Sequence, residues 1–205
     1  MLFEVICDDF KQKRIEFHAG LNTVLGDNEG SNSIGKSTFL LIIDYVFGGD
    51  DYLTKWPDVQ KNIGFHTIKF AYKFNNEIYR FARDTKDAEL IYECDEKYNK
   101  IKEISINSYT SFLANEYQLD LSYITFRNIV GRYIRVYGKD NYDEKRPLHV
   151  VANEQAGAPV NALLKLFGKY RILDELQTVA DDKNERYKLY KKAQQHSYLV
   201  LIKHR

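Results

Sequence analysis

The sequence predicts an α/β fold, and three consecutive segments carry this prediction. Asn22–Leu25 is short and partly β-branched and precedes a glycine, which is typical of a buried strand that ends in a loop. Ser37–Phe47 is long, apolar and free of glycine and proline, and it stops at a glycine pair, as a helix with a glycine terminator does. Between them lies the loop Gly30–Thr38, whose composition suggests a ligand site.

This loop fits the motif G-x-x-x-x-G-K-[ST], which binds nucleotide phosphates. Its glycines let backbone N–H groups point at phosphate oxygens, and the positive end of the following helix lies beneath them. We expect Lys36 to contact the β- and γ-phosphates of ATP and the Ser37 hydroxyl to ligate Mg²⁺. The predicted nucleotide-binding residues are Gly30, Ser31, Asn32, Ser33, Ile34, Gly35, Lys36, Ser37 and Thr38. The motif therefore predicts a P-loop NTPase fold with ATP and Mg²⁺ as cofactors.

The alternative interpretation is a turn rich in glycine and serine that happens to precede a helix. At ordinary residue frequencies the four fixed positions coincide by chance in about one chain of this length in a hundred. The strand-like and helix-like flanks make coincidence rarer still, so we favour the nucleotide site.

Composition limits the function classes. The chain has 205 residues, is 44% hydrophobic and carries a formal net charge of +1, which allows a core and argues against a basic nucleic-acid surface over the whole protein. Cys7 and Cys94 lack metal-site spacing and indicate reduced thiols. No apolar run approaches the ~20 residues that span a bilayer, and no signal peptide is visible. We expect a soluble, cytoplasmic chain without a membrane partner.

The strand-like segments alternate apolar and polar residues and favour an antiparallel meander. Asn75-Asn76 is a two-residue polar turn between the clearest pair, which predicts a β-hairpin. The predicted strands are Leu2–Cys7, Arg14–Phe17, Thr67–Phe74, Glu77–Arg83, Glu89–Cys94 and Lys100–Ile104. We interpret Phe70, Tyr72 and Phe74 as one sheet face rather than a base-stacking platform.

Helical patterns follow the meander. Ser108–Leu119 has apolar residues at near-helical spacing, and Val160–Phe167 is a short helix closed by a glycine, after a mostly irregular stretch. If Leu121–Val136 is one helix, Arg127 and Arg135 share a face. Such a row either contacts nucleotide or DNA phosphates or pairs with surface carboxylates, and the sequence leaves both open.

The chain divides into residues 1–170, which form one lobe, and residues 171–205, a helical appendage. The appendage has a 4-3-4-3-4 spacing that resembles heptads, although two of its positions are basic. These positions are Ile172, Leu176, Val179, Lys183, Arg186 and Tyr190. We favour the start of a coiled coil over a solvated terminal helix. Residues 198–202 break the rhythm without an evident reason.

A complete ATPase also needs an acidic residue at the end of an apolar strand and a group that orients water. Leu40–Asp44 matches the first pattern only superficially, because it lies within the helix that leaves the loop, where Asp44 points away from the metal. The sequence contains no signature motif of the form L-S-G-G-Q. We therefore assign no catalytic residue and expect this chain alone to be inactive.

The hairpin Phe3–Phe17, the run Gly20–Gly26 and the loop Asn32–Thr38 resemble the N-terminal half of an SMC-like ATPase head of the ABC superclass. Those ATPases act in chromosome maintenance and DNA repair. The loop, followed by Phe126-Arg127 and Leu166–Gly168 ahead of a charged helix, looks most like the SMC-like subunits of bacterial three-component or antiphage defence systems. Ser33 departs from the glycine usual in the family loop. The specific likeness covers about the first 50 residues.

The resemblance implies an ABC-type N-terminal lobe that is followed by a coiled-coil arm. ATP hydrolysis would then need a C-terminal lobe and a second head, in a homo- or heterodimer, and DNA would be a partner. The chain would be either a truncated piece or a natural split gene. The family also has a glutamine that contacts Mg²⁺ between the lobes; Gln118 and Gln155 are candidates by their order in the chain, and no motif chooses between them.

Two functions of other classes stay open. One is a non-catalytic, nucleotide-gated interaction or DNA-tethering module. The other is a self-sufficient P-loop kinase or GTPase, against which the absence of a guanine-reading N-K-x-D argues.

Overall fold

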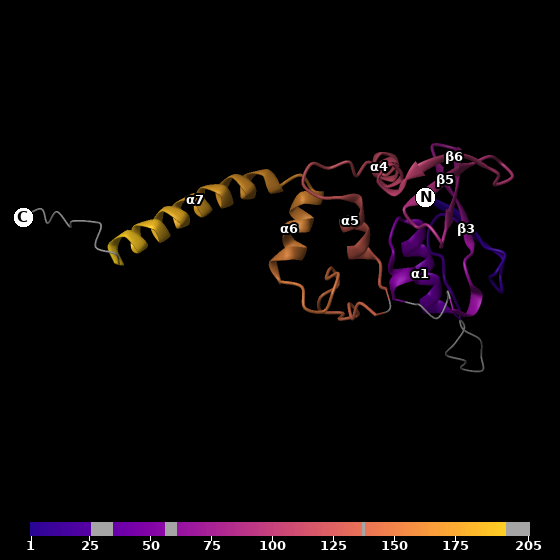
Figure 1. The fold of residues 1–205 in the computed structure, drawn as a ribbon, viewed down its shortest axis with the longest axis horizontal. Coiled ribbons are helices and arrows are strands. Elements are labelled where there is room, and N and C mark those ends of the chain that lie inside the picture. Colours follow the sequence, from indigo (N-terminus) through magenta and orange to yellow (C-terminus); the bar gives the residue numbers. More distant parts are fainter. Residues whose placement is uncertain (26–34, 56–60, 137, 196–205) are drawn as a thin grey trace, which may run out of the picture.

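The computed structural model describes residues 1–25, 35–55, 61–136 and 138–195. Within this part, an antiparallel sheet and the helices α1 and α4 lie at one end, α5 and α6 lie beside them, and the long helix α7 extends away from the rest (Figure 1). The fold is a mixed α/β fold, as the sequence predicts at that level.

The sheet contains six antiparallel strands in the order β2-β1-β3-β4-β5-β6. The strands are β1 Leu2–Ile6, β2 Arg14–Glu16, β3 Thr67–Phe74, β4 Glu77–Asp84, β5 Leu90–Cys94 and β6 Lys100–Ser105. Each predicted strand of the meander is present, with ends shifted by a few residues at most. The strands follow sequence order except at one edge, where β2 is outermost and β1 pairs with both β2 and β3.

The central hairpin shows why the local prediction succeeded. β3 and β4 pair along their whole length, from Thr67 with Asp84 to Phe74 with Glu77. Asn75 and Asn76 both have positive φ, at 46° and 69°. Two successive left-handed residues are the requirement of the hairpin turn that matches strand twist, and asparagine tolerates that conformation better than most residues do.

The core lies between one face of this sheet and two helices, α1 (Lys36–Val46) and α4 (Ile106–Glu116). Phe70, Tyr72 and Phe74 of β3 are all buried, which confirms that they form one sheet face. Their neighbours across the interface include Tyr109 of α4, whose ring centroid lies 6.0 Å from that of Phe70. Aromatic packing of this kind adds directional contacts to the burial of apolar surface.

Two features of this region differ from the prediction. Asn22–Leu25, expected as a buried strand, is not a strand, and its side chains are exposed. Leu121–Val136 is not one helix: α5 spans only Phe126–Tyr133 and begins where the Thr125 hydroxyl accepts a hydrogen bond from the Asn128 N–H. Because the backbone becomes extended at Ile134, Arg135 lies beyond the end of α5, and the condition for a face shared with Arg127 is not met.

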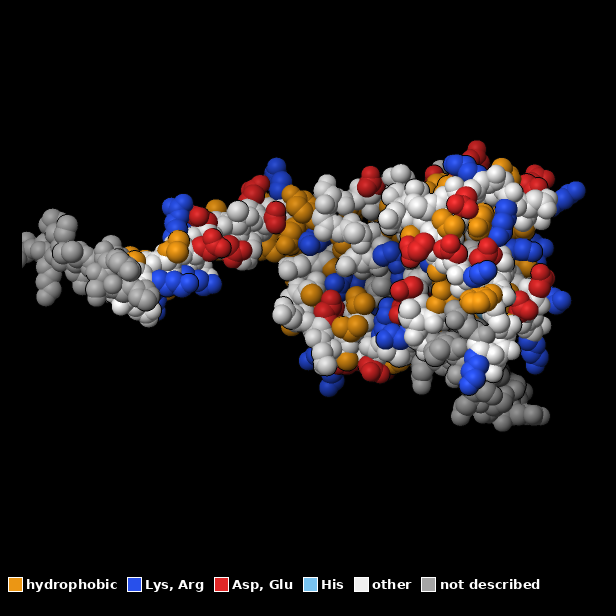
Figure 2. Space-filling view, in the orientation of Figure 1, with side chains coloured by type: hydrophobic (Ala, Val, Ile, Leu, Met, Phe, Trp, Pro, Cys, Tyr) orange, Lys and Arg blue, Asp and Glu red, His pale blue; other side chains and the backbone are white. Residues whose placement is uncertain are grey.

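The remaining helices are α2 Asp51–Thr54, α6 Gly157–Leu166 and α7 Tyr170–Gln195. α7 has no buried residue, and Ile172, Leu176 and Val179 of the predicted heptads are exposed. The coiled coil and the division at residue 170 stay predictions. Residues 198–202 lie outside the described part. On the face shown in Figure 2, acidic and basic side chains are interspersed rather than gathered into one basic patch.

Candidate functional site

The described part of the predicted loop is its C-terminal end, where α1 begins. Gly35 has φ 78° and ψ 13°, a left-handed conformation that a residue with a Cβ adopts only with strain. A Cβ added at Gly35 would meet no heavy atom within 4 Å, so the glycine is required by backbone conformation rather than by crowding. Gly30–Ile34 lie outside the described residues.

The N-terminus of α1 is open and electropositive. No side chain of the described residues caps it, and no acidic residue occupies its first turn. The first N–H groups of a helix have no partner within the helix, and they carry the positive end of its dipole. Lys36 and Ser37 are exposed at this end, while Thr38 is half-buried. An ammonium group, a hydroxyl and free amides together match the chemistry of a phosphate site.

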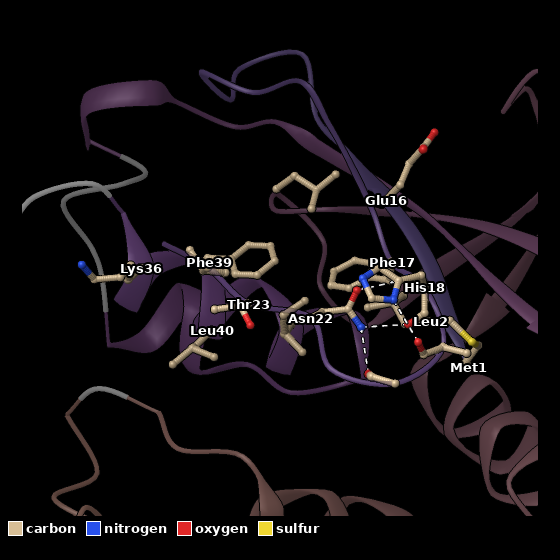
Figure 3. A pocket seen from close by; sticks show the side chains of 15 residues that line it. Met1, Leu2, Glu16, Phe17, His18, Asn22, Thr23, Lys36, Phe39 and Leu40 are labelled. Atoms are coloured by element: carbon tan, nitrogen blue, oxygen red, sulfur yellow. Dashed lines mark hydrogen bonds between the residues drawn. The ribbon is translucent and has the colours of Figure 1, made fainter. Parts of the chain in front are cut away.

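A groove of about 850 Å³ runs from this end along α1. Figure 3 shows Lys36 at one end, His18 and Asn22 toward the other, and Phe39 and Leu40 between them. The wall is mainly apolar: the Phe39 ring stacks on Phe17, with centroids 6.1 Å apart. The groove therefore continues the candidate phosphate site with an apolar surface.

The segment that follows β2 is held by the side chain of Asn22. This amide accepts a hydrogen bond from the His18 N–H at 3.0 Å and donates to the His18 and Gly20 carbonyls at 2.8 and 3.2 Å. The apolar residues beside it are left outside the core, with Leu21 84% and Leu25 80% exposed. Asn22, the first residue of the predicted strand, thus closes a turn with His18, and no strand of the described sheet pairs with residues 23–25.

Asp44 is not a free carboxylate near the candidate site. It is 1% exposed, and its Oδ1 accepts a hydrogen bond from Arg127 Nη2 at 2.6 Å. Its other oxygen, Oδ2, has no hydrogen-bond partner in the described chain. Burial raises the pKa of Asp44, and the nearby guanidinium of Arg127 opposes that rise. This pairing agrees with the exclusion of Asp44 as a metal ligand.

The other end of α1 is held by groups that the sequence did not reveal. Arg83 of β4 donates from Nη1 to the carbonyls of Tyr45 and Gly49, both at 2.7 Å. The Val46 carbonyl accepts from the hydroxyls of Tyr72 at 2.9 Å and Tyr109 at 2.6 Å. The Tyr45 carbonyl also accepts from the Gly48 N–H at 3.0 Å, and Gly49 lies beyond the helix. The side chains therefore join the last turn of α1 and the residues after it to β3, β4 and α4.

The other arginines and glutamines singled out above do not reach the groove. Arg132 forms a two-point ion pair with Glu154, at 3.0 and 3.2 Å. Burial alone would raise the pKa of Glu154, but hydrogen bonds from Arg132 and from the Val150 N–H lower it overall. Arg127 and Arg132 thus pair with carboxylates that are largely buried, whereas Arg135 donates to the Arg132 carbonyl at 3.1 Å. Gln118 and Gln155 are exposed and lie outside the groove lining.

Comparison with protein-family models and with curated proteins finds no match to this sequence. A proposal of function therefore rests on the residues of the chain. In the described ranges, no group of three or more His, Cys, Asp or Glu side chains could hold a metal ion. No helix of the described part is both long and apolar enough to cross a membrane.

Proposed function

We propose that this chain binds Mg-ATP at Gly30–Thr38, as the ATP-binding N-terminal lobe of an SMC-like ATPase that acts on DNA. The observation that carries the proposal is the open end of α1: it follows a complete phosphate-loop motif, has a left-handed glycine at its start and has neither a side-chain cap nor an acid in its first turn. An ordinary surface helix is stabilised by such groups, whereas a helix that binds an anion is better without them.

The residues present fit the cofactor. Lys36 is exposed and free to reach phosphate oxygens, and the exposed Ser37 hydroxyl is a suitable hard ligand for Mg²⁺. Mg-ATP would supply a phosphoryl group whose transfer depends on charge neutralisation. This chain would contribute binding and orientation of the triphosphate.

The apolar groove supports a second part of the proposal, a C-terminal ATPase lobe or a second head as partner. Leu21, Val24 and Leu40 are 84%, 51% and 41% exposed beside a groove whose walls are mainly apolar. Exposed apolar surface at a candidate site is costly unless another surface covers it. A complementary lobe would cover the unpaired segment 21–25 and bring the acidic residues that hydrolysis needs.

Isothermal titration with Mg-ATP, Mg-ADP and Mg-GTP tests the first part. We expect micromolar binding of ATP and, in Lys36→Ala, an affinity weakened about tenfold or more, since the ammonium makes charge-assisted contacts. Lys73→Ala, which removes an exposed lysine on β3, is the control and should bind as the unaltered chain does. Equal affinities in the two variants would refute the proposed site.

The purified chain is expected to bind ATP without turnover above the buffer background. Glu16, the one carboxylate that lines the groove in the described chain, pairs with Arg14 at 3.1 Å and lies away from Lys36 in Figure 3, so it is not placed to bind the metal of a nucleotide at Lys36. A coupled phosphate-release assay measures this directly. Sustained hydrolysis by the monomer, abolished in Lys36→Ala, would show that the chain holds a complete site and that no partner lobe is needed.

A further inference from the structure

A second, smaller cavity lies between α5 and α6, which run side by side in Figure 1. Its volume is about 330 Å³, and most of its wall is polar. The polar residues that line it are Tyr123, Thr125, Asn128, Arg132, Asn161 and Lys165. The lining contains two cations and no acidic residue, which distinguishes it from the mixed charges of the visible surface.

The charge of the wall comes from Lys165 and from α5. Lys165 lies with its Nζ 4.4 Å from the centre of the Tyr170 ring and forms no ion pair with any described carboxylate. The N-terminus of α5 opens on the same cavity through Thr125 and Asn128, and its first turn contains no acid. A helix N-terminus and an unpaired ammonium attract the same kind of ligand, an anion.

Arg132 adds an unsatisfied donor. Its side chain is 8% exposed, and Glu154 neutralises its charge through Nη1 and Nη2. Its Nε, however, has no hydrogen-bond partner in the described chain. A buried donor without a partner is rare in proteins and indicates an absent water or ligand. The side-chain amides of Asn128, which is exposed, and Asn161, which is half-buried, make no hydrogen bond with any described residue and face water when the cavity is empty.

We propose that this cavity binds a phosphate group, at a site separate from the one at the start of α1. A water molecule occupies about 30 Å³, so the cavity of about 330 Å³ has room for several times that volume, enough for a phosphate with an attached sugar. Lys165 supplies the charge, and Nε of Arg132 and the two asparagine side chains supply donors. The phosphate belongs either to a nucleic-acid backbone or to a free phosphate ester, because both present the same oxygens.

The test uses the full chain carrying Lys36→Ala, so that the proposed nucleotide site does not contribute. Titration with inorganic phosphate, followed by amide NMR, is expected to give saturable shifts at the start of α5 and around Asn161. Adding Lys165→Gln should weaken phosphate binding about tenfold. Lys169→Gln, which replaces an exposed lysine outside the cavity, should leave phosphate binding unchanged. Thermal melts of both variants verify that they are folded.

Two further titrations separate the sources of the phosphate. If the source is nucleic acid, Lys165→Gln weakens binding of a duplex oligonucleotide equally for unrelated sequences and reduces the slope of log K against log salt by about 0.9. If the source is a free ester, the variant weakens binding of AMP and leaves the duplex unaffected. The proposal is overturned if Lys165→Gln and Lys169→Gln bind phosphate, AMP and duplex with equal affinities, or if the chain binds none of the three.

Discussion

Replacing Arg83 with methionine is expected to lower the free energy of unfolding by about 3–5 kcal/mol, the cost of breaking a buried charged network. Arg83 is 1% exposed, and its guanidinium lies 3.8 Å above the Tyr45 ring. Besides the two carbonyls at the end of α1, it donates from Nε and Nη2 to the Ala88 carbonyl at 2.9 and 2.7 Å. Methionine fills the space but leaves the buried carbonyls of Tyr45 and Gly49 and the half-buried carbonyl of Ala88 without these donors.

Urea denaturation followed by circular dichroism measures the change. Arg80→Met is the matched control, because Arg80 lies on the same strand and its side chain makes no hydrogen bond within the described chain; we expect a change within about 0.5 kcal/mol. Arg83→Lys should fall near Arg83→Met, since a single ammonium cannot reproduce the planar fork that reaches separate carbonyls. A loss below about 1 kcal/mol for Arg83→Met would mean that water replaces the guanidinium at little cost.

Arg127→Met alone is expected to lower the free energy of unfolding by about 3–5 kcal/mol near neutral pH, because it leaves the Asp44 carboxylate buried and unpaired. Asp44→Asn should cost less, about 1–2 kcal/mol, since the Arg127 side chain is 27% exposed and can be hydrated. The double variant should be more stable than the sum of the single losses predicts, with a coupling energy above about 0.5 kcal/mol. Arg146→Met removes an exposed ion pair and serves as the control.

The same variants have a defined pH dependence. Burial raises the folded-state pKa of Asp44 above its unfolded value, so the native state takes up the proton first as pH falls. Removing Arg127 takes away the group that opposes this rise. The deficit of Arg127→Met should therefore shrink as pH falls through the folded-state pKa of Asp44, and Asp44→Asn should abolish that trend. Denaturation at several pH values would contradict the account if the deficit grew in acid.

The parts of the fold that the sequence predicted correctly depend on local patterns. Alternation within the meander and the Asn75-Asn76 turn specify the strands and the hairpin β3–β4 without reference to the rest of the chain. The helix α1 follows from an uninterrupted apolar run and a terminal glycine pair. At the candidate site, the same local information predicted the helix start that the structure places after Gly35.

The errors and omissions have a common cause, which is dependence on distant partners. A strand at 22–25 needs a neighbouring strand, and the described sheet offers none. Arg83 lies two residues after Phe81 on β4 and so faces the core. Only the tertiary structure shows that the carbonyls of Tyr45 and Gly49 accept its hydrogen bonds there. The Asp44–Arg127 pair joins residues 83 positions apart, and nothing in the pattern of either segment indicates the other.

Tyr72 and Tyr109 donate to the Val46 carbonyl, and Arg83 and Arg127 donate to neighbouring carbonyls, so the last turn of α1 is joined to β3, β4, α4 and α5. The 11 residues of α1 span about 16 Å, and Leu41 and Ile42 in the middle of this length are buried in the core. Sliding of α1 along its axis would break the hydrogen bonds from β3, β4 and α4 together.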